Sequence, residues 1–179
     1  GYDPLRDIQV ITPAKQGPLG TRELNRLLQG KLNPPERGKG EATLMGRTLR
    51  EGDKVMQIRN NYDIIWQQPD GTAGTGIFNG DMGIIEMLDP GSKTIQVRFE
   101  EKLATYSFEN QDQLEHAYAV TVHKSQGSEF EAVVMPLERR HPKLHYRNLL
   151  YTAVTRARKL LIMTGQKETV YAMVQNNRR

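Results

Sequence analysis

The chain has 179 residues, a formal net charge of +4 and no cysteine. Hydrophobic residues make up 37% and charged residues 26%, with a mean hydropathy of −0.64, which is typical of a globular protein in water. No apolar run reaches the roughly 20 residues that cross a bilayer, and no signal peptide opens the chain. The missing cysteines exclude a disulfide framework and thiolate metal sites. We therefore expect a cytoplasmic protein with no membrane partner, and the slight positive charge favours a polyanionic partner without establishing one.

The first 30 residues follow an α/β pattern. The apolar run 8–12 ends at Pro13 and predicts a buried strand. A glycine-rich turn at 17–20 comes next, then a helix that we expect to begin at Thr21 and to stop at Gly30, with Leu24, Leu27 and Leu28 on one face. The chain opens at Gly1 without an initiator methionine, almost directly on this strand, so we expect it to be a fragment.

The middle of the chain has a β pattern. A stretch rich in proline and glycine at 33–40 predicts a linker, and runs at 54–59 and 77–88 predict strands. The dipeptide Asn79-Gly80 interrupts the second run and predicts a hairpin turn. Alternating apolar residues return at 95–99 and 106–108, while 71–76 is expected to be a loop. This segment predicts a small β-barrel or meander.

Alternating strands and helices return after Gln113. Strands are predicted at 117–122, 132–136 and 159–164, with a helix at 146–157. Such alternation indicates a mainly parallel sheet. The predicted architecture is therefore a discontinuous α/β domain, 1–40 and 110–179, interrupted by a β module at 41–109.

Polar residues cluster after the predicted strand that ends near Thr121. They form the run Thr-Val-His-Lys-Ser-Gln-Gly-Ser-Glu-Phe from Thr121 to Phe130. Ligands bind open α/β sheets at the carboxyl ends of the strands, where Gly127 would let a phosphate approach and Glu129 would accept from a sugar hydroxyl. A solvated loop with a satisfied histidine remains an equal alternative on the residues alone.

A second run, Leu150 to Arg158, reads Leu-Tyr-Thr-Ala-Val-Thr-Arg-Ala-Arg. Arg156 and Arg158 precede a buried strand, where a guanidinium is costly without an anionic partner. Its planar fork of donors suits phosphate oxygens. Favourable charge at a helix carboxyl terminus is the alternative explanation for the two arginines.

Together these runs resemble motifs V and VI of superfamily 1 helicases. The opening Gln9-Val10-Ile11-Thr12-Pro13, with the glycine turn and Leu24-Asn25, is similar to motif IV of RecD-like enzymes. The sequence Gln-Gly-Ser-Glu that begins at Gln126 differs from the Lys-Gly-Leu-Glu sequence typical of UvrD- and Rep-like enzymes. The resemblance covers nearly the whole chain and implies the RecD/TraA branch, whose members move 5′ to 3′ on single-stranded DNA.

The resemblance implies a fold and a set of roles. The fold is a RecA-like, mainly parallel sheet flanked by helices and interrupted by an SH3-like barrel. Arg156 would be the arginine finger on the γ-phosphate of ATP, with Gly127, Glu129 and Lys15 also on the nucleotide. The positions matching those that contact DNA are Thr121 and His123. On the barrel the candidate contacts are Lys54, Arg59 and Arg98, for each of which ordinary surface charge is the alternative.

The printed sequence has no G-x-x-x-x-G-K-[ST] phosphate loop. The run Gly91-Ser92-Lys93-Thr94 lacks both glycines of that motif and lies between predicted strands. By family analogy the phosphate cradle and the Mg²⁺ ligands would lie on an N-terminal motor domain, and this chain alone would be inactive. No carboxylate cluster suggests a metal or nuclease site.

The leading functional prediction is therefore the C-terminal part of an ATP-dependent 5′–3′ DNA helicase or translocase. It would supply the arginine finger and part of the track for single-stranded DNA. Two alternatives remain open: a non-enzymatic module that binds single-stranded nucleic acid by charge and stacking, and half of a 3′–5′ UvrD-like motor.

Overall fold

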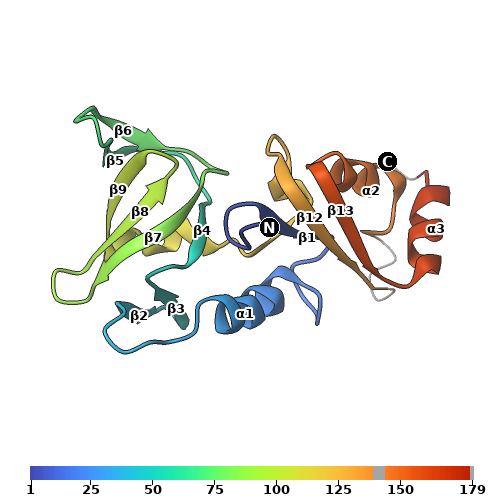
Figure 1. Cartoon of the computed structure of the whole chain (residues 1–179), viewed down its shortest axis with the longest axis horizontal. Coiled ribbons are helices and arrows are strands. Elements are labelled where there is room, and N and C mark those ends of the chain that lie inside the picture. The colour runs from blue at the N-terminus through green and yellow to red at the C-terminus, as the bar shows by residue number, and fades with distance from the viewer. Residues whose placement is uncertain (139–143, 178–179) are drawn as a thin grey trace. The chain divides into compact units, whose positions relative to one another are not determined.

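A computed structural model describes residues 1–138 and 144–177. It divides the chain into two compact units (Figure 1): unit 1 is Gly1–Leu28 with Tyr118–Arg179, and unit 2 is Gln29–Ala117. Unit 2 extends beyond the predicted 41–109 insertion at both ends. Within the described residues, no helix is long and apolar enough to cross a membrane.

Unit 1 is built on a four-stranded sheet in which every neighbouring pair is parallel. In spatial order the strands are β11 (Ala119–Thr121), β1 (Ile8–Thr12), β12 (Phe130–Leu137) and β13 (Ala157–Gly165). Its helices are α1 (Thr21–Leu32), α2 (Arg147–Val154) and α3 (Lys167–Gln175), with the 3-10 turn η2 (His123–Ser125) after β11. Because the strands are parallel, the loops that follow them emerge at one common edge.

Apolar side chains of the strands and of α2 form the core of unit 1. Ile11, Val133 and Met135 on the strands are fully buried, as is Ala153 on α2. The predicted helix 146–157 is shorter than expected, because the Arg156 N–H bonds to the Ala153 carbonyl and the Arg156 carbonyl already accepts from Phe130 of β12. The following strand therefore begins at Ala157 rather than at Lys159.

Helix α1 runs past Gly30, so the prediction that this glycine ends the helix was wrong. The helical bond from the Asn33 N–H to the Gln29 carbonyl, 2.9 Å long, still forms. Pro34 follows, and a proline disfavours helical backbone in the residue before it. The proline, rather than the glycine, therefore explains where the helix stops.

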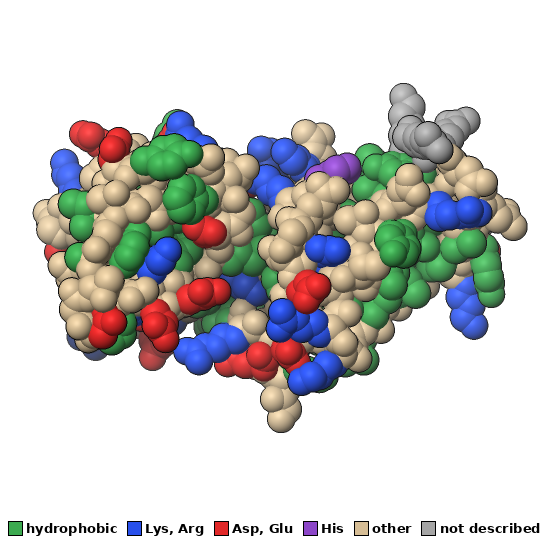
Figure 2. Space-filling view, turned by 90° about the horizontal axis from the view of Figure 1, so that it is seen from above, with side chains coloured by type: hydrophobic (Ala, Val, Ile, Leu, Met, Phe, Trp, Pro, Cys, Tyr) green, Lys and Arg blue, Asp and Glu red, His purple; other side chains and the backbone are tan. Residues whose placement is uncertain are grey.

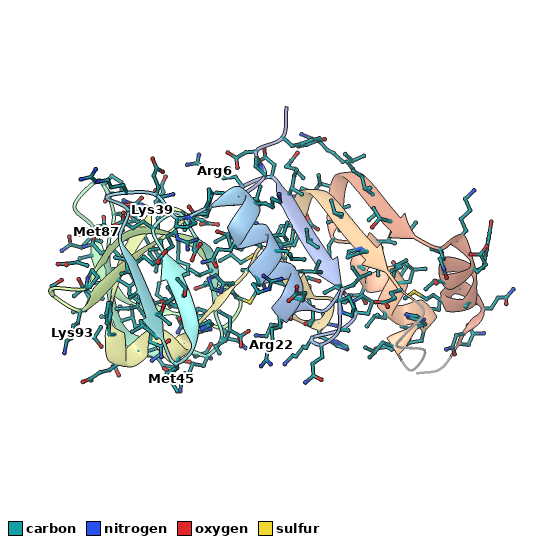
Figure 3. The ribbon with its side chains drawn as sticks, turned by 90° about the horizontal axis from the view of Figure 1, so that it is seen from below. Arg6, Arg22, Lys39, Met45, Met87 and Lys93 are labelled. Atoms are coloured by element: carbon teal, nitrogen blue, oxygen red, sulfur yellow. The ribbon has the colours of Figure 1, made fainter. Side chains whose placement is uncertain are left out.

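Unit 2 contains a seven-stranded antiparallel sheet and a separate hairpin. The spatial order of the large sheet is β10 (Leu114–His116), β4 (Lys54–Gln57), β7 (Met82–Asp89), β8 (Thr94–Phe99), β9 (Lys102–Ser107), β5 (Asn61–Gln67) and β6 (Ala73–Ile77). The hairpin pairs β2 (Glu41–Leu44) with β3 (Arg47–Arg50), and its turn holds Met45, which points outward and is 87% exposed (Figure 3). The 3-10 helix η1 (Phe108–Gln113) precedes β10.

The Asn79-Gly80 turn forms, but it does not make the predicted hairpin. The strands on either side do not pair, since β6 bonds to β5 while β7 bonds to β4 and β8. The turn instead lies beside the end of β4, where the Gly80 N–H donates to the Gln57 carbonyl and the Gln57 N–H donates to the Asp81 carbonyl. The predicted loop 71–76 is largely β6, and Phe108 begins η1 instead of continuing a strand.

A single apolar cluster fills unit 2. It includes Leu49, Val55, Ile85, Val97 and Tyr106, all less than 2% exposed. The inward residues of β8 alternate with outward ones, as the sequence pattern predicted. This core gives the inserted unit its own source of stability.

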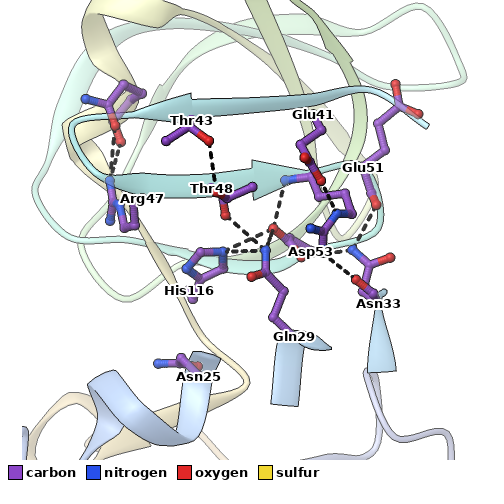
Figure 4. A network of polar contacts seen from close by, with 12 residues as sticks. Asn25, Gln29, Asn33, Glu41, Thr43, Arg47, Thr48, Glu51, Asp53 and His116 are labelled. Carbon is purple, nitrogen blue, oxygen red and sulfur yellow. Dashed lines mark hydrogen bonds and ion pairs between the residues drawn. The ribbon is translucent and has the colours of Figure 1, made fainter. Parts of the chain in front are cut away.

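A buried carboxylate ties the end of α1 to the strands of unit 2 (Figure 4). Asp53, which is fully buried, accepts hydrogen bonds from Gln29 Nε2 at 2.7 Å, Asn33 Nδ2 at 2.8 Å and the Arg50 N–H at 2.8 Å. His116 Nε2 lies 3.1 Å from the same carboxylate. Each of these contacts satisfies a polar group inside the unit, which is what the burial of a carboxylate requires.

Candidate functional site

The carboxyl edge of the parallel sheet in unit 1 carries an open groove of about 580 Å³. The loop after β1 and the turn after β11 meet there, and the residues that line it are Pro13, Ala14, Lys15, Gln16, Thr121, His123, Lys124 and Leu144. The Thr12 hydroxyl donates to the Leu19 carbonyl at 2.6 Å, which fixes the loop after β1. Three of the predicted site residues, Lys15, Thr121 and His123, are thus brought together.

Within the groove, Thr121 and His123 have different roles. Thr121 is 6% exposed, and its hydroxyl accepts the Lys124 N–H at 3.3 Å, so it shapes the turn η2. His123 is exposed on the same turn. The buried Ser125 hydroxyl donates to the Val122 carbonyl at 2.7 Å and holds the turn closed. On this turn, His123 and Lys124 line the groove and can reach a ligand directly.

Arg156 lies at the opposite edge of the sheet, between α2 and the amino end of β13. Its guanidinium donates to the carbonyls of Thr152 at 3.2 Å and Ser128 at 3.1 Å, and to the Thr155 hydroxyl at 3.2 Å. The side chain is half-buried, and no carboxylate among the described residues pairs with it. Arg156 therefore joins the helix of the second motif to the loop of the first.

Gly127 and Glu129 lie on that loop as it approaches β12. Gly127 has φ +83° and open space where a Cβ would stand, so its backbone is accessible to a ligand. Glu129 is exposed and accepts from Arg158 Nε at 3.0 Å. Next to this pair, the Glu131 carboxylate hydrogen-bonds to Lys159 at 2.6 Å and raises the pKa of that ammonium. Ion pairs this exposed exchange readily with other ligands.

Lys15 was predicted on the nucleotide side with Arg156, and the structure places it elsewhere. Lys15 follows β1 at the carboxyl edge, whereas Arg156 precedes β13 at the amino edge. The eight residues of β12 separate the two edges by roughly 25 Å. Lys15 therefore belongs to the groove with His123, and Arg156, Gly127 and Glu129 form a separate group.

The three cations predicted on the barrel are not free surface charges. Lys54 is 6% exposed and belongs to the interior, which corrects its prediction as a surface contact. Arg59 forms an ion pair with Asp112. Arg98 donates two bonds to Glu86, at 2.7 and 3.0 Å, and a third to the Glu101 carbonyl at 3.2 Å. A phosphate would have to compete with these partners.

Lys124, which lines the groove, was missed as a candidate. Lys124 stands inside the Thr121–Phe130 run, so its position next to His123 was a usable signal. Arg22 points outward from the first turn of α1, and its backbone N–H donates to the Lys15 carbonyl at 3.3 Å (Figure 3). This backbone bond links the loop of Lys15 to the helix, and Arg22 is not among the residues that line the groove. In the described part of the chain no group of three His, Asp or Glu side chains gathers as a metal site.

The geometry defines a class: a RecA-like domain with an arginine near one sheet edge and a basic groove at the other, interrupted by an antiparallel module. Residues 24–99 match a family described as the SH3 domain of ATP-dependent RecD-like DNA helicases. Residues 116–164 match the UvrD-like helicase C-terminal domain. The two matches together extend over most of the chain and show its similarity to the RecD-like helicases, which confirms the predicted family and fold class.

Individual relatives agree with this assignment. The ATP-dependent RecD2 DNA helicase of Deinococcus radiodurans is 35% identical over 158 residues, which are 88% of this chain and 20% of that protein. The RecBCD enzyme subunit RecD of Mycolicibacterium smegmatis is 27% identical over 171 residues, 96% of this chain and 27% of that subunit. The chain thus spans about a quarter or less of these two relatives.

A solved structure shows the same fold. The Pif1 helicase from Bacteroides, in complex with ADP-AlF3 and single-stranded DNA, superposes with a TM-score of 0.59 at 18% identity. The match covers 97% of this chain and 43% of the Pif1 chain. At this identity the likeness concerns the fold alone.

Proposed function

We propose that this chain is the second motor domain, with its SH3-like insertion, of an ATP-dependent 5′–3′ DNA helicase or translocase. In this proposal Arg156 binds the γ-phosphate of ATP, and Gly127 and Glu129 lie beside the nucleotide. The groove with Lys15 and His123 holds the phosphate backbone of single-stranded DNA. The phosphate cradle and the Mg²⁺ ligands come from an N-terminal motor domain, which is the main protein partner.

The observation that carries the proposal is the state of Arg156. A guanidinium has five N–H donors, and Arg156 gives three of them to neutral oxygens. Its positive charge is half-buried and has no carboxylate to balance it within the described residues, which is unfavourable unless an anion binds. The two remaining N–H groups can meet two phosphate oxygens, the geometry that arginine adopts with phosphates.

This arrangement explains what Arg156 would contribute to phosphoryl transfer. Charge spreads over the three equatorial oxygens of the γ-phosphate in the transition state, and a fixed guanidinium stabilises that charge. The contacts to Thr152 and Ser128 hold Arg156 in place before ATP arrives, so little reorganisation is needed. Because Ser128 follows the turn that carries His123, the nucleotide residue and the DNA groove share one short segment of chain.

The test uses the complete helicase, in which this segment is joined to its N-terminal motor domain. Arg156→Ala should lower DNA-stimulated ATP hydrolysis by about 10³–10⁵-fold while leaving DNA affinity nearly unchanged. The matched control is Arg158→Ala, which removes an exposed arginine paired with Glu129 and should change the rate only slightly.

Three results would contradict the proposal or part of it. Wild-type ATPase in Arg156→Ala, with DNA binding lost, would favour the non-enzymatic binding module. Robust ATP turnover by the 179-residue chain alone would exclude the shared ATP site. Faster unwinding of 3′-tailed than of 5′-tailed duplexes would replace the proposed polarity with that of a UvrD-like motor.

A further inference from the structure

Two aromatic side chains form an exposed pair on unit 2. Tyr62 on β5 and Phe78 just after β6 have ring centroids 5.6 Å apart and planes inclined by 71°. Tyr62 is 66% exposed and Phe78 41%. An edge-to-face contact covers at most one ring face, and the exposed fractions show that part of each ring is accessible to a third ring. Figure 2 views unit 2 from the side of β5 and β6, where hydrophobic side chains reach the surface.

The local backbone holds this pair in position. The Phe78 N–H donates to Asp81 Oδ2 at 2.9 Å, and the Asn79 N–H donates to Asn60 Oδ1 at 3.0 Å. Gly76 has φ +101°, and a Cβ there would stand 3.2 Å from the end of the Phe78 ring. The rings are therefore oriented before any ligand arrives, which lowers the entropic cost of binding.

The groups around the pair indicate what it binds. Asn60 and Asn79 are exposed, and within the described residues the Nδ2 of Asn60 and the side-chain amide of Asn79 have no hydrogen-bond partner. A carboxamide offers a donor and an acceptor side by side, as the edge of a nucleobase requires. The neighbouring Arg59 is already paired with Asp112. Exposed rings, the side-chain amide of Asn79 and the Nδ2 of Asn60 fit a planar ligand with a polar edge better than a phosphate.

We propose that Tyr62 and Phe78 form a stacking site for a base of single-stranded nucleic acid, with Asn60 and Asn79 at the base edge. This inference rests on the proposed function, because it gives unit 2 a contact of its own with the same class of ligand, single-stranded DNA. It assigns the two contacts different chemistry. The groove binds phosphates and is sensitive to salt, whereas the aromatic pair binds a base and is not.

The test measures binding of the 179-residue chain to two fluorescent oligomers of about 12 nucleotides, oligo-dT and an abasic deoxyribose-phosphate chain. Tyr62→Ala and Phe78→Ala should each weaken oligo-dT binding about tenfold and leave abasic binding unchanged. The dependence of log affinity on log salt should keep its slope, since no ionic contact is lost. Tyr62→Phe and Phe78→Tyr should bind as wild type does.

Tyr171→Ala is the matched control, because Tyr171 on α3 is also 66% exposed and lies in unit 1. It should leave both affinities unchanged. A second measurement needs no variant: the ring-proton resonances of Tyr62 and Phe78 in the wild-type chain should shift upfield with oligo-dT and stay in place with the abasic chain. This readout remains valid if an alanine variant is poorly folded.

The outcomes separate the two proposals. Unchanged oligo-dT affinity in Tyr62→Ala and Phe78→Ala, or equal wild-type affinity for both oligomers, would overturn the stacking site and leave the proposed function standing. Loss of binding in the Tyr171→Ala control to the same extent would also overturn it. If wild-type chain binds neither oligomer, the DNA track and the stacking site both fall.

Discussion

Arg156 of unit 1 and three arginines of unit 2 differ in how their charge is balanced. In unit 2, the arginines that the structure joins to carboxylates of the same unit are Arg50 with Glu41, Arg59 with Asp112 and Arg98 with Glu86. In unit 1, Arg158 is paired with Glu129 in the same manner, whereas Arg156 contacts only backbone and hydroxyl oxygens. Counting positive residues along the sequence therefore does not locate an anion site. What distinguishes the site is a cation whose charge the protein itself leaves unbalanced.

Unit 2 also contains a buried negative charge, the carboxylate of Asp53, and hydrogen-bond donors of the unit surround it. Asp53→Ala should lower the free energy of unfolding of unit 2 by about 3–5 kcal/mol, because the side chains of Gln29, Asn33 and His116 lose their shared acceptor inside the protein. Urea unfolding followed by the fluorescence of Trp66 measures this, since the chain has one tryptophan and it lies in unit 2.

Asp112→Ala is the control for this experiment. Asp112 also accepts from a cation of unit 2, but its side chain is 47% exposed, so its removal should cost less than about 1 kcal/mol. If the two variants unfold at the same urea concentration, the Asp53 network does not hold α1 to the strands as described.

A smaller effect concerns Tyr106, which is fully buried and donates its hydroxyl proton to Gln57 Oε1 at 2.9 Å. Burial raises the pKa of this phenol well above its ordinary value of about 10. The unfolded chain ionises Tyr106 near pH 10 while the folded chain keeps it neutral, so its contribution to stability is complete below pH 10 and falls as the pH rises. Between pH 9 and pH 11 the loss should be about 1.4 kcal/mol.

Tyr106→Phe isolates this contribution. The variant keeps the ring but leaves Gln57 Oε1 without its donor, so it should start about 1 kcal/mol less stable at neutral pH. Its stability should then decline less than that of the wild type between pH 9 and pH 11, as measured by urea unfolding at each pH. Parallel declines in the two proteins would show that Tyr106 ionises normally in the folded state.

The sequence predicted the elements whose signals are local. The strand 8–12, the alternation at 95–99 and the helix with Leu149 and Ala153 were found because each buries a periodic apolar face. Features set by distant residues were not predictable in this way. The Asn79-Gly80 turn carries a strong hairpin signal, yet the partner of each flanking strand lies elsewhere in the sheet.

The distinction between local signals and features set by distant residues also applies to the candidate site. The two motifs predicted which residues to consider, but Gly127 and Glu129 were expected at the carboxyl ends of the strands and instead lie on the loop that enters β12 at its amino end. Lys15 was grouped with the nucleotide through the resemblance to motif IV, although its position directly after the predicted strand 8–12 already places it at the carboxyl edge of the sheet. The burial of Lys54 was equally hidden, because all four residues of its strand are buried in the folded unit and no apolar alternation marks this in the sequence.

The smallest predicted effect compares a cation that has no carboxylate partner with one that has. It therefore tests directly whether carboxylate pairing decides which cations of this chain bind an anion. Lys15 is exposed in the groove, and no ion pair within the described residues involves it, whereas Arg98 gives two bonds to Glu86. Lys15→Ala should weaken binding of oligo-dT by the 179-residue chain about threefold and reduce the salt slope by about one. Arg98→Ala should change neither quantity.

Releasing Arg98 sharpens the test. Glu86→Gln removes the carboxylate but keeps a side chain of similar size, so it should leave Arg98 free to attract phosphates and should steepen the salt slope. The double variant with Arg98→Ala should return to the wild-type slope, because the gain depends on that guanidinium. Equal losses in Lys15→Ala and Arg98→Ala would instead mean that the ion pair with Glu86 opens freely. In that case carboxylate pairing does not separate the binding cations of this chain from the structural ones.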